Sequence, residues 1–221
     1  LYGRGSAGGI VNRVLKRPQA NPVNDVGVTL GTRGERRGEF DLGWNANDAA
    51  RFRMTGAAEN SNSFRDQFQL NRQAIAPSAQ FKLDRDTVLN VEFDYLHDRR
   101  TSDQGVPAYR GRPVDVPINT YYGSADGVNS SYNDVSAKSA TVSLDHRFND
   151  SLSFHGAIRA YDFSLERKNY VNYEPIKTAA HPVVTLDQST RQRTDHGIDG
   201  LFELTQKTSL FGMRHELLYG L

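Results

Sequence analysis

The sequence has no cysteine, no long apolar run and almost no net charge. Because none of the 221 residues is cysteine, a disulfide framework and a thiolate metal site are both excluded. No stretch approaches the roughly 20 consecutive apolar residues of a membrane helix, so a helical membrane protein is excluded as well. A formal net charge of +1 gives no basis for predicting a nucleic-acid partner.

What the sequence does contain is apolar and polar residues in alternation, whereas helical periodicity is nearly absent. In residues 89–95 the odd positions are apolar and the even positions are polar, as Phe93 and Asp94 illustrate. The same pattern predicts about nine strands, at residues 25–33, 36–46, 51–60, 72–83, 88–97, 138–148, 152–167, 191–204 and 213–221. The polar rows carry full charges and the apolar rows include Gly and Ala. This fits a lipid-facing exterior around a wet interior better than a packed core. We therefore expect an all-β fold, a portion of an antiparallel transmembrane β-barrel.

The connections between these strands alternate in length. Short polar turns are expected at residues 47–50, 84–87, 149–151 and 205–208, and longer polar connections at 59–73, 98–137 and 168–192. The first hairpin, near residues 33–35, is the one exception, because it is short at a position where the alternation predicts a long connection. Short turns at one end and long loops at the other are typical of outer-membrane barrels. In the seventh strand the apolar parity changes near Ala160 and Tyr161, which indicates a bulge or the point where the strand leaves the bilayer.

The first residues contain a glycine pattern that admits two interpretations. Gly3, Gly5 and Gly8 satisfy the G-x-G-x-x-G fingerprint of dinucleotide-binding folds. That fingerprint requires a strand before it and a helix after it. Residues 10–14 are instead rich in β-branched side chains and are followed by Pro18, which favours a strand. The nucleotide interpretation therefore fails on its context.

Residues 1–18, LYGRGSAGGIVNRVLKRP, resemble the stretch that closes the plug domain of TonB-dependent siderophore receptors. The family's elements occur in order, as Leu1-Tyr2-Gly3, Gly8-Gly9, Asn12 and Lys16-Arg17-Pro18. The resemblance implies that residues 1–20 end a plug domain and that 21–221 begin a barrel of about 22 strands. It also implies a structural plug motif made of Gly3, Gly5, Gly8, Gly9 and Asn12.

The resemblance further implies a receptor and transporter for ferric siderophores in the Gram-negative outer membrane, energised through TonB. The expected partners are the ferric siderophore, TonB, outer-membrane lipid and lipopolysaccharide, with no nucleic acid. No resident cofactor, metal site or enzymatic activity is expected. The chain starts inside a motif and stops within a predicted strand, so we expect an internal fragment whose TonB-contacting segment lies upstream of Leu1.

The long connection at residues 98–137 holds the candidate ligand-binding residues. Tyrosine offers a flat amphipathic surface with a hydroxyl, and arginine pairs with anionic oxygens, so both suit a bulky iron chelate. The candidates are Tyr109, Arg110, Tyr121, Tyr122 and Tyr132. The alternative is that these side chains pack the loop or girdle the barrel rim. The next long connection, with Tyr170, Tyr173, Glu174 and His181, is a weaker candidate.

Other charged residues suggest no catalytic chemistry. Arg4 and Arg13 are expected to face acidic residues of the barrel wall, in a structural role. The six histidines show no H-x-x-x-H spacing, so we expect them to be solvated or hydrogen-bonded rather than metal ligands. Three other classes remain open: a passive porin, an outer-membrane barrel enzyme and a soluble β-sandwich or adhesin.

Overall fold

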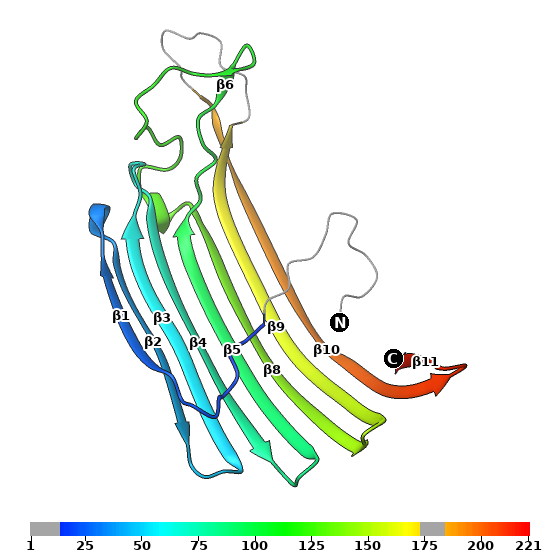
Figure 1. Ribbon diagram of the computed structural model, residues 1–221. Coiled ribbons are helices and arrows are strands. Elements are labelled where there is room, and N and C mark those ends of the chain that lie inside the picture. The colour runs from blue at the N-terminus through cyan, green and yellow to red at the C-terminus, as the bar shows by residue number, and fades with distance from the viewer. Residues whose placement is uncertain (1–13, 173–183) are drawn as a thin grey trace.

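A computed structural model of the protein describes residues 14–172 and 184–221, and within them the fold is all-β. Nine strands form one antiparallel sheet in the order β1-β2-β3-β4-β5-β8-β9-β10-β11 (Figure 1). Their bounds are β1 Asn24–Leu30, β2 Arg36–Asn45, β3 Ala50–Asn62, β4 Gln69–Lys82, β5 Thr87–Thr101, β8 Tyr132–Asn149, β9 Leu152–Asn172, β10 Leu186–Leu210 and β11 Met213–Gly220. The nine-stranded antiparallel prediction is confirmed. No helix in the described residues is long and apolar enough to cross a membrane.

Two short elements lie outside the large sheet. β6 (Ala108–Tyr109) and β7 (Arg112–Pro113) form a small hairpin within the connection from β5 to β8. Single 3-10 turns occur at Thr32–Gly34 and Gly127–Asn129. The predicted plug motif, with Gly3, Gly5, Gly8, Gly9 and Asn12, lies outside the described residues.

The two ends of the sheet differ as the sequence predicted. The β2–β3, β4–β5, β8–β9 and β10–β11 connections are tight turns at one end, which we call the turn end (Figure 1). The described β1–β2, β3–β4 and β5–β8 connections lie at the opposite end, which we call the loop end. There the link from β5 to β8 spans residues 102–131, whereas the link from β3 to β4 is only residues 63–68. The prediction of a long connection over 59–73 was therefore wrong, because both strands continue beyond their apolar stretches.

The turn predicted at residues 205–208 was also wrong. β10 runs through it to Leu210, and the chain reverses at Phe211 and Gly212, whose φ values are 53° and 75°. Thr, Gln and Lys are polar but fit an extended, solvated strand, so polarity alone misplaced the turn. Glycine adopts a positive φ without steric cost, which makes Gly212 the better turn residue.

No bulge accompanies the parity change in β9. Ala160 and Tyr161 sit opposite Ala140 and Ser139 of β8 in an unbroken ladder, and β9 also pairs continuously with β10. The one register shift in the β8–β9 ladder falls near the turn end, between Arg147 and Asn149. The unbroken ladder excludes the bulge as the cause of the parity change. The other interpretation, that the strand leaves the bilayer at this point, is consistent with it.

The two faces of the sheet are sorted by polarity. We call the face that residues 16–18 contact the inner face and the opposite one the outer face. On β2 to β5 several charged side chains of the inner face are buried, with Glu92 at 8% and Asp94 at 7% exposure. Apolar side chains on the outer face are exposed, with Val142 at 46% and Ile158 at 51%. The sequence prediction of apolar rows on the outside and charged rows on the inside is confirmed.

An aromatic cluster lies on the outer face near the turn end. The rings of Trp44 and Phe52 stack with centroids 5.3 Å apart, and Phe52 meets Phe81 edge-on at 5.8 Å. These residues belong to three successive strands, so the cluster runs across the sheet rather than along it. Transverse aromatic girdles of this kind mark the membrane interfaces of β-barrels.

Candidate functional site

The extended segment before β1 crosses the inner face and is fixed there by side chains of the wall. Pro18 is buried and disfavours the helical region for the residue before it, so the chain stays extended at Arg17. The Ser78 hydroxyl donates to the Lys16 carbonyl at 3.0 Å, and the Arg53 guanidinium donates to the Arg17 carbonyl at 3.0 Å. These contacts hold the segment through its backbone, independently of its own side chains.

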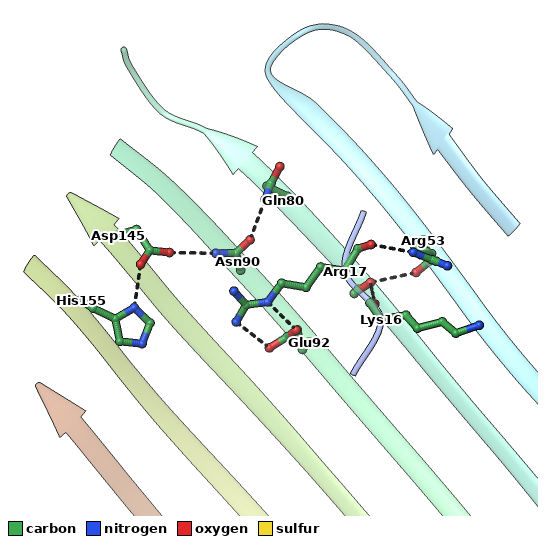
Figure 2. Close-up of polar contacts among 9 residues, drawn as sticks. Lys16, Arg17, Arg53, Gln80, Asn90, Glu92, Asp145 and His155 are labelled. Carbon is green, nitrogen blue, oxygen red and sulfur yellow. Dashed lines mark hydrogen bonds and ion pairs between the residues drawn. The ribbon is translucent and has the colours of Figure 1, made fainter. Parts of the chain in front are cut away.

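The two basic side chains of this segment each meet an acid of the wall, and Figure 2 shows the pair that Arg17 forms with Glu92. Lys16 Nζ lies 2.7 Å from Asp41 Oδ2 on β2, and Arg17 Nε lies 2.9 Å from Glu92 Oε1 on β5. The hydrogen bond to Glu92 is the largest cause raising the pKa of Arg17. The segment is therefore clamped to two strands that lie three positions apart in the sheet.

Arg53 on β3 joins the two halves of this clamp. Its Nε and second terminal nitrogen donate to the two Asp41 oxygens at 2.7 and 2.8 Å. Arg53 is only 7% exposed and Asp41 8%, and a bidentate pair of this kind has a fixed geometry. Asp41 thus accepts from both the wall and the segment, and the remaining Arg53 donor reaches the Arg17 carbonyl.

A separate chain of hydrogen bonds crosses the inner face beside the clamp, from β4 to β9. Gln80 donates to Asn90 at 3.0 Å, Asn90 donates to Asp145 at 3.4 Å, and His155 Nδ1 lies 2.7 Å from Asp145 (Figure 2). The four residues lie on β4, β5, β8 and β9. Asp145 also raises the pKa of Arg17 through its charge, so this chain and the clamp act on the same guanidinium.

The sequence analysis did not predict the ion pairs of Lys16 and Arg17 with the wall. Arg4 and Arg13, expected to face acids of the wall, lie outside the described residues. Lys16 and Arg17 were treated only as the basic exit of the motif. Their position immediately before Pro18 could have indicated the clamp. The chain is extended there, and successive side chains of an extended chain point to opposite sides.

At the loop end, the long connection is tied to the shorter one beside it. Arg65 Nε lies 2.9 Å from Asp103 Oδ2, and an Arg65 terminal nitrogen donates to the Thr120 carbonyl at 2.6 Å. The Asp66 amide donates to the Asn119 carbonyl at 2.9 Å. Residues 102–131 are therefore packed against residues 63–68 rather than free of the sheet.

Four of the five predicted ligand-binding residues lie in the long connection, at three separate places. Tyr109 and Arg110 lie at the β6–β7 hairpin, with the guanidinium 5.3 Å from the ring centroid. The Tyr121 hydroxyl donates to the Ser102 carbonyl at 3.2 Å, and partial burial raises the pKa of this phenol. Tyr122 lines a small cavity of about 70 Å³ together with Tyr170. The structure thus brings Tyr122 together with Tyr170, from the second predicted loop.

Tyr132 does not lie in the loop at all. It is the first residue of β8, where its ring packs 4.1 Å from the Arg99 guanidinium and its hydroxyl donates to Glu166 at 2.6 Å. Arg99 also pairs with Asp134 at 2.8 Å, and His97 Nε2 lies 2.9 Å from the same carboxylate. These side chains form a polar cluster on the outer face. This agrees with the alternative interpretation, in which such side chains girdle the barrel rim. Tyr173, Glu174 and His181 lie outside the described residues.

Metal binding has no support in the described part of the chain, where no group of three or more His, Cys, Asp or Glu side chains could hold an ion. His155 and His97 instead contact carboxylates on neighbouring strands. Strand neighbours such as Asp145 and His146 point to opposite faces, so these pairs form across strands rather than along them.

An antiparallel sheet with a charged inner face, an exposed apolar outer face and alternating turn and loop lengths is the wall of a β-barrel. The family description TonB dependent receptor-like, beta-barrel, matches residues 74–221, and the chain belongs to this family. The family expectation drawn from residues 1–18 is thereby confirmed by a different part of the chain.

Similar proteins agree with this assignment. The chain is 29% identical over its whole length to the metal-pseudopaline receptor CntO of Pseudomonas aeruginosa, covering 31% of that protein. It is 25% identical to the catecholate siderophore receptor Fiu of Escherichia coli over 72% of the chain and 22% of Fiu. The chain therefore spans about a third or less of these relatives.

Solved structures agree on the fold. The closed form of the ferric-catecholate import receptor Fiu from E. coli K12 superposes with a TM-score of 0.85 at 20% identity, over 99% of this chain and 33% of that one. The ferripyoverdine receptor of P. aeruginosa, bound to ferripyoverdine, gives 0.81 at 17% identity over 93% and 28%.

Proposed function

We propose that the chain is part of an outer-membrane receptor that takes up ferric siderophores in a Gram-negative bacterium and is energised through TonB. The observation that carries the proposal is the sorting of the sheet's faces, with buried charges inside and exposed apolar side chains outside. A wall of this kind separates acyl chains from a hydrated lumen. Family membership and the receptor roles of the relatives CntO and Fiu support a receptor rather than a passive pore.

The clamp at residues 16 and 17 has a defined role in this proposal. Residues 1–20 would end the plug, and the force transmitted through TonB would act on the chain upstream of them. Lys16–Asp41, Arg17–Glu92 and the backbone contacts from Ser78 and Arg53 would then hold the plug's exit on the wall while the upstream part moves.

Ligand binding is assigned to the loop end. Tyr109, Arg110, Tyr121 and Tyr122 lie in residues 102–131, where the tie to residues 63–68 keeps the loop ordered. Loops held on a rigid scaffold commonly carry binding residues. Lipid and lipopolysaccharide would meet the outer face, where the aromatic cluster and the Tyr132 cluster lie.

Uptake by the intact receptor tests the proposal. The full-length gene, expressed in a strain lacking its own siderophore receptors, should restore accumulation of radioactive iron from one of a panel of hydroxamate, catecholate and carboxylate chelates. Deleting TonB should abolish that accumulation. Uptake that persists without TonB would identify a passive porin, and no uptake of any chelate would contradict the siderophore assignment.

Binding of the transported chelate to the purified full-length receptor separates the roles of the tyrosines. Tyr122→Ala opens the cavity shared with Tyr170, whereas Tyr132→Phe removes only the hydroxyl that bonds Glu166 on the outer face. We expect the first to weaken binding of the transported chelate and the second to leave it unchanged. Equal affinities of both variants and the parent would remove Tyr122 from the ligand site.

A further inference from the structure

A row of inner-face residues crosses the sheet near the loop end and is rich in arginine. Arg100 of β5 sits opposite Asn133 of β8, Asn133 sits opposite Arg167 of β9, and Arg167 sits opposite Arg191 of β10. On the outer face at this level the residues beside them, Glu166 and Gln192, are polar. The row therefore lies beyond the apolar outer band, at the mouth of the wall.

The β4–β5 part of this region is balanced in charge. Arg72 Nε lies 2.7 Å from Asp98, and Arg100 makes a short pair with the same carboxylate. Glu59 sits opposite Arg72 on β3 and pairs with Arg37 at 3.2 Å. The arginines here are held by acids of the wall and are not free to bind a ligand.

The β9–β10 part is not balanced. Arg167 and Arg191 face one another directly, and neither forms an ion pair within the described residues. Arg167 Nε is buried with no hydrogen-bond partner, and so is Oδ1 of Asn169 two residues along. Like charges directly opposite each other destabilise a sheet, and an unsatisfied buried donor adds to that cost.

None of the inner-face neighbours that the structure describes compensates the charge of this pair. On β8, the residue opposite Arg167 is Asn133. In the two adjacent inner-face rows, Leu165 lies opposite Arg193 and Asn169 lies opposite Ser189. Arg193 is already paired with Asp195 at 2.6 Å. The next acid toward the loop end, Asp187, lies two rows away opposite Val171.

We propose that Arg167 and Arg191 form an anion site on the inner wall that takes a carboxylate of the transported chelate, an inference that rests on the proposed function. The planar guanidinium matches a carboxylate in a bidentate fork, and a carboxylate between two such groups removes their mutual repulsion. The amide of Asn133 adds a donor on the same face. The site therefore favours chelates with free carboxylates over neutral ones.

The test uses the detergent-solubilised full-length receptor with iron-free citrate as the probe, so that it needs no transport. Arg167→Gln and Arg191→Gln are made singly and together. Arg193→Gln is the matched control, because Arg193 lies on the same face of β10 but is paired with Asp195. The unfolding midpoint is measured with citrate and with sodium chloride at equal ionic strength.

We expect citrate to raise the unfolding midpoint of the parent and of Arg193→Gln, and to have no effect on the double variant. In a receptor that transports a ferric carboxylate chelate, the double variant should bind that chelate at least tenfold more weakly, with affinity for a neutral trihydroxamate unchanged. No citrate effect on the parent, or an equal effect on the double variant, overturns the site. A double variant that only loses stability without citrate, with its citrate response intact, shows that the arginines hold the plug instead.

The two proposals fail in distinguishable ways. Citrate stabilisation that depends on Arg167 and Arg191, with no uptake of any ferric chelate, keeps the anion site and rejects the siderophore assignment. TonB-dependent uptake, together with a citrate response that is unchanged when both arginines are replaced, keeps the siderophore assignment and rejects the anion site.

Discussion

The two halves of β9 differ in polarity although they share one backbone ladder. From Leu152 to Ala160 the outer side chains include Phe154 and Ile158, and the inner ones include His155 and Arg159. Beyond Tyr161 the arrangement reverses. The outer residues are Asp162, Ser164 and Glu166, and the inner ones are Tyr161, Phe163 and Leu165. Since the register does not slip, the difference must come from what surrounds each half of the strand.

The same boundary crosses the neighbouring strands at one level. The last apolar outer row consists of Phe93, Ala140, Ala160 and Ile198. The next row toward the loop end consists of Tyr95, Lys138, Asp162 and His196. A boundary shared by four strands is a property of the surface rather than of one sequence, and a bilayer rim accounts for it.

The largest expected effect comes from placing a charge on either side of that boundary. In the full-length receptor folded into lipid vesicles, Ile158→Lys should lower the free energy of unfolding by about 2–4 kcal/mol, because the ammonium meets acyl chains. Ser164→Lys, on the same strand and face but beyond the boundary, should change it by no more than about 0.5 kcal/mol. Urea titration of the vesicle-inserted receptor measures both, and equal costs would place the two positions in one environment.

Periodicity predicted most of this fold because the alternation of apolar and polar residues along a strand is a local property of the sequence. The rows around Phe93 and Asp94, the nine strands and the sense of the faces all followed from it. The strand ends did not, because residues such as Thr205 and Lys207 are equally compatible with a turn and with a solvated strand. The clamp at Lys16 and Arg17 depends on how β2, β3, β4 and β5 are ordered in the sheet. That order is set by contacts between residues far apart in the sequence, which local periodicity does not reveal.

The second prediction concerns the inner face near the turn end. Asp41→Asn removes the charge that Arg53 and Lys16 share, and should cost about 1–3 kcal/mol, since charge-assisted bonds to a buried guanidinium are lost. Glu39→Gln, one inner position away on β2, loosens only the pair with Arg37, in which Glu39 is 52% exposed. That change should cost at most about 1 kcal/mol. Chemical denaturation ranks the two, and a larger cost at Glu39 would contradict the clamp.

A smaller effect is expected at the turn that the sequence misplaced. Gly212 has a φ of 75°, so Gly212→Ala should cost about 1–2 kcal/mol from the left-handed backbone, although no atom crowds the new methyl group. Gly38→Ala is the control, because its surroundings are equally open and its φ is not in that region. Thermal or urea unfolding separates them; if Gly212→Ala were as mild as Gly38→Ala, the turn would lie elsewhere.

The smallest effect is expected at the boundary itself. Lys138 and Asp162 form an exposed ion pair at 3.6 Å in the first polar outer row. Lys138→Met should change stability by no more than about 1 kcal/mol, and the difference should shrink as salt is raised. Denaturation at low and high ionic strength checks this. A loss of several kcal/mol that is insensitive to salt would mean that the pair is buried in the intact receptor.

The most direct measurement is a cysteine scan along β9, with spin labels at positions 154–167, in a full-length receptor from which any other cysteine has been removed. Collisions with oxygen and with a water-soluble nickel chelate report lipid and water at each position. Labels at positions 154, 156, 158 and 160 should favour oxygen, those at 155, 157 and 159 should not, and the even positions from 162 onward should favour nickel. Labels at 157 and 159 that favour oxygen over those at 156 and 158 would place the charged face in lipid and contradict the account.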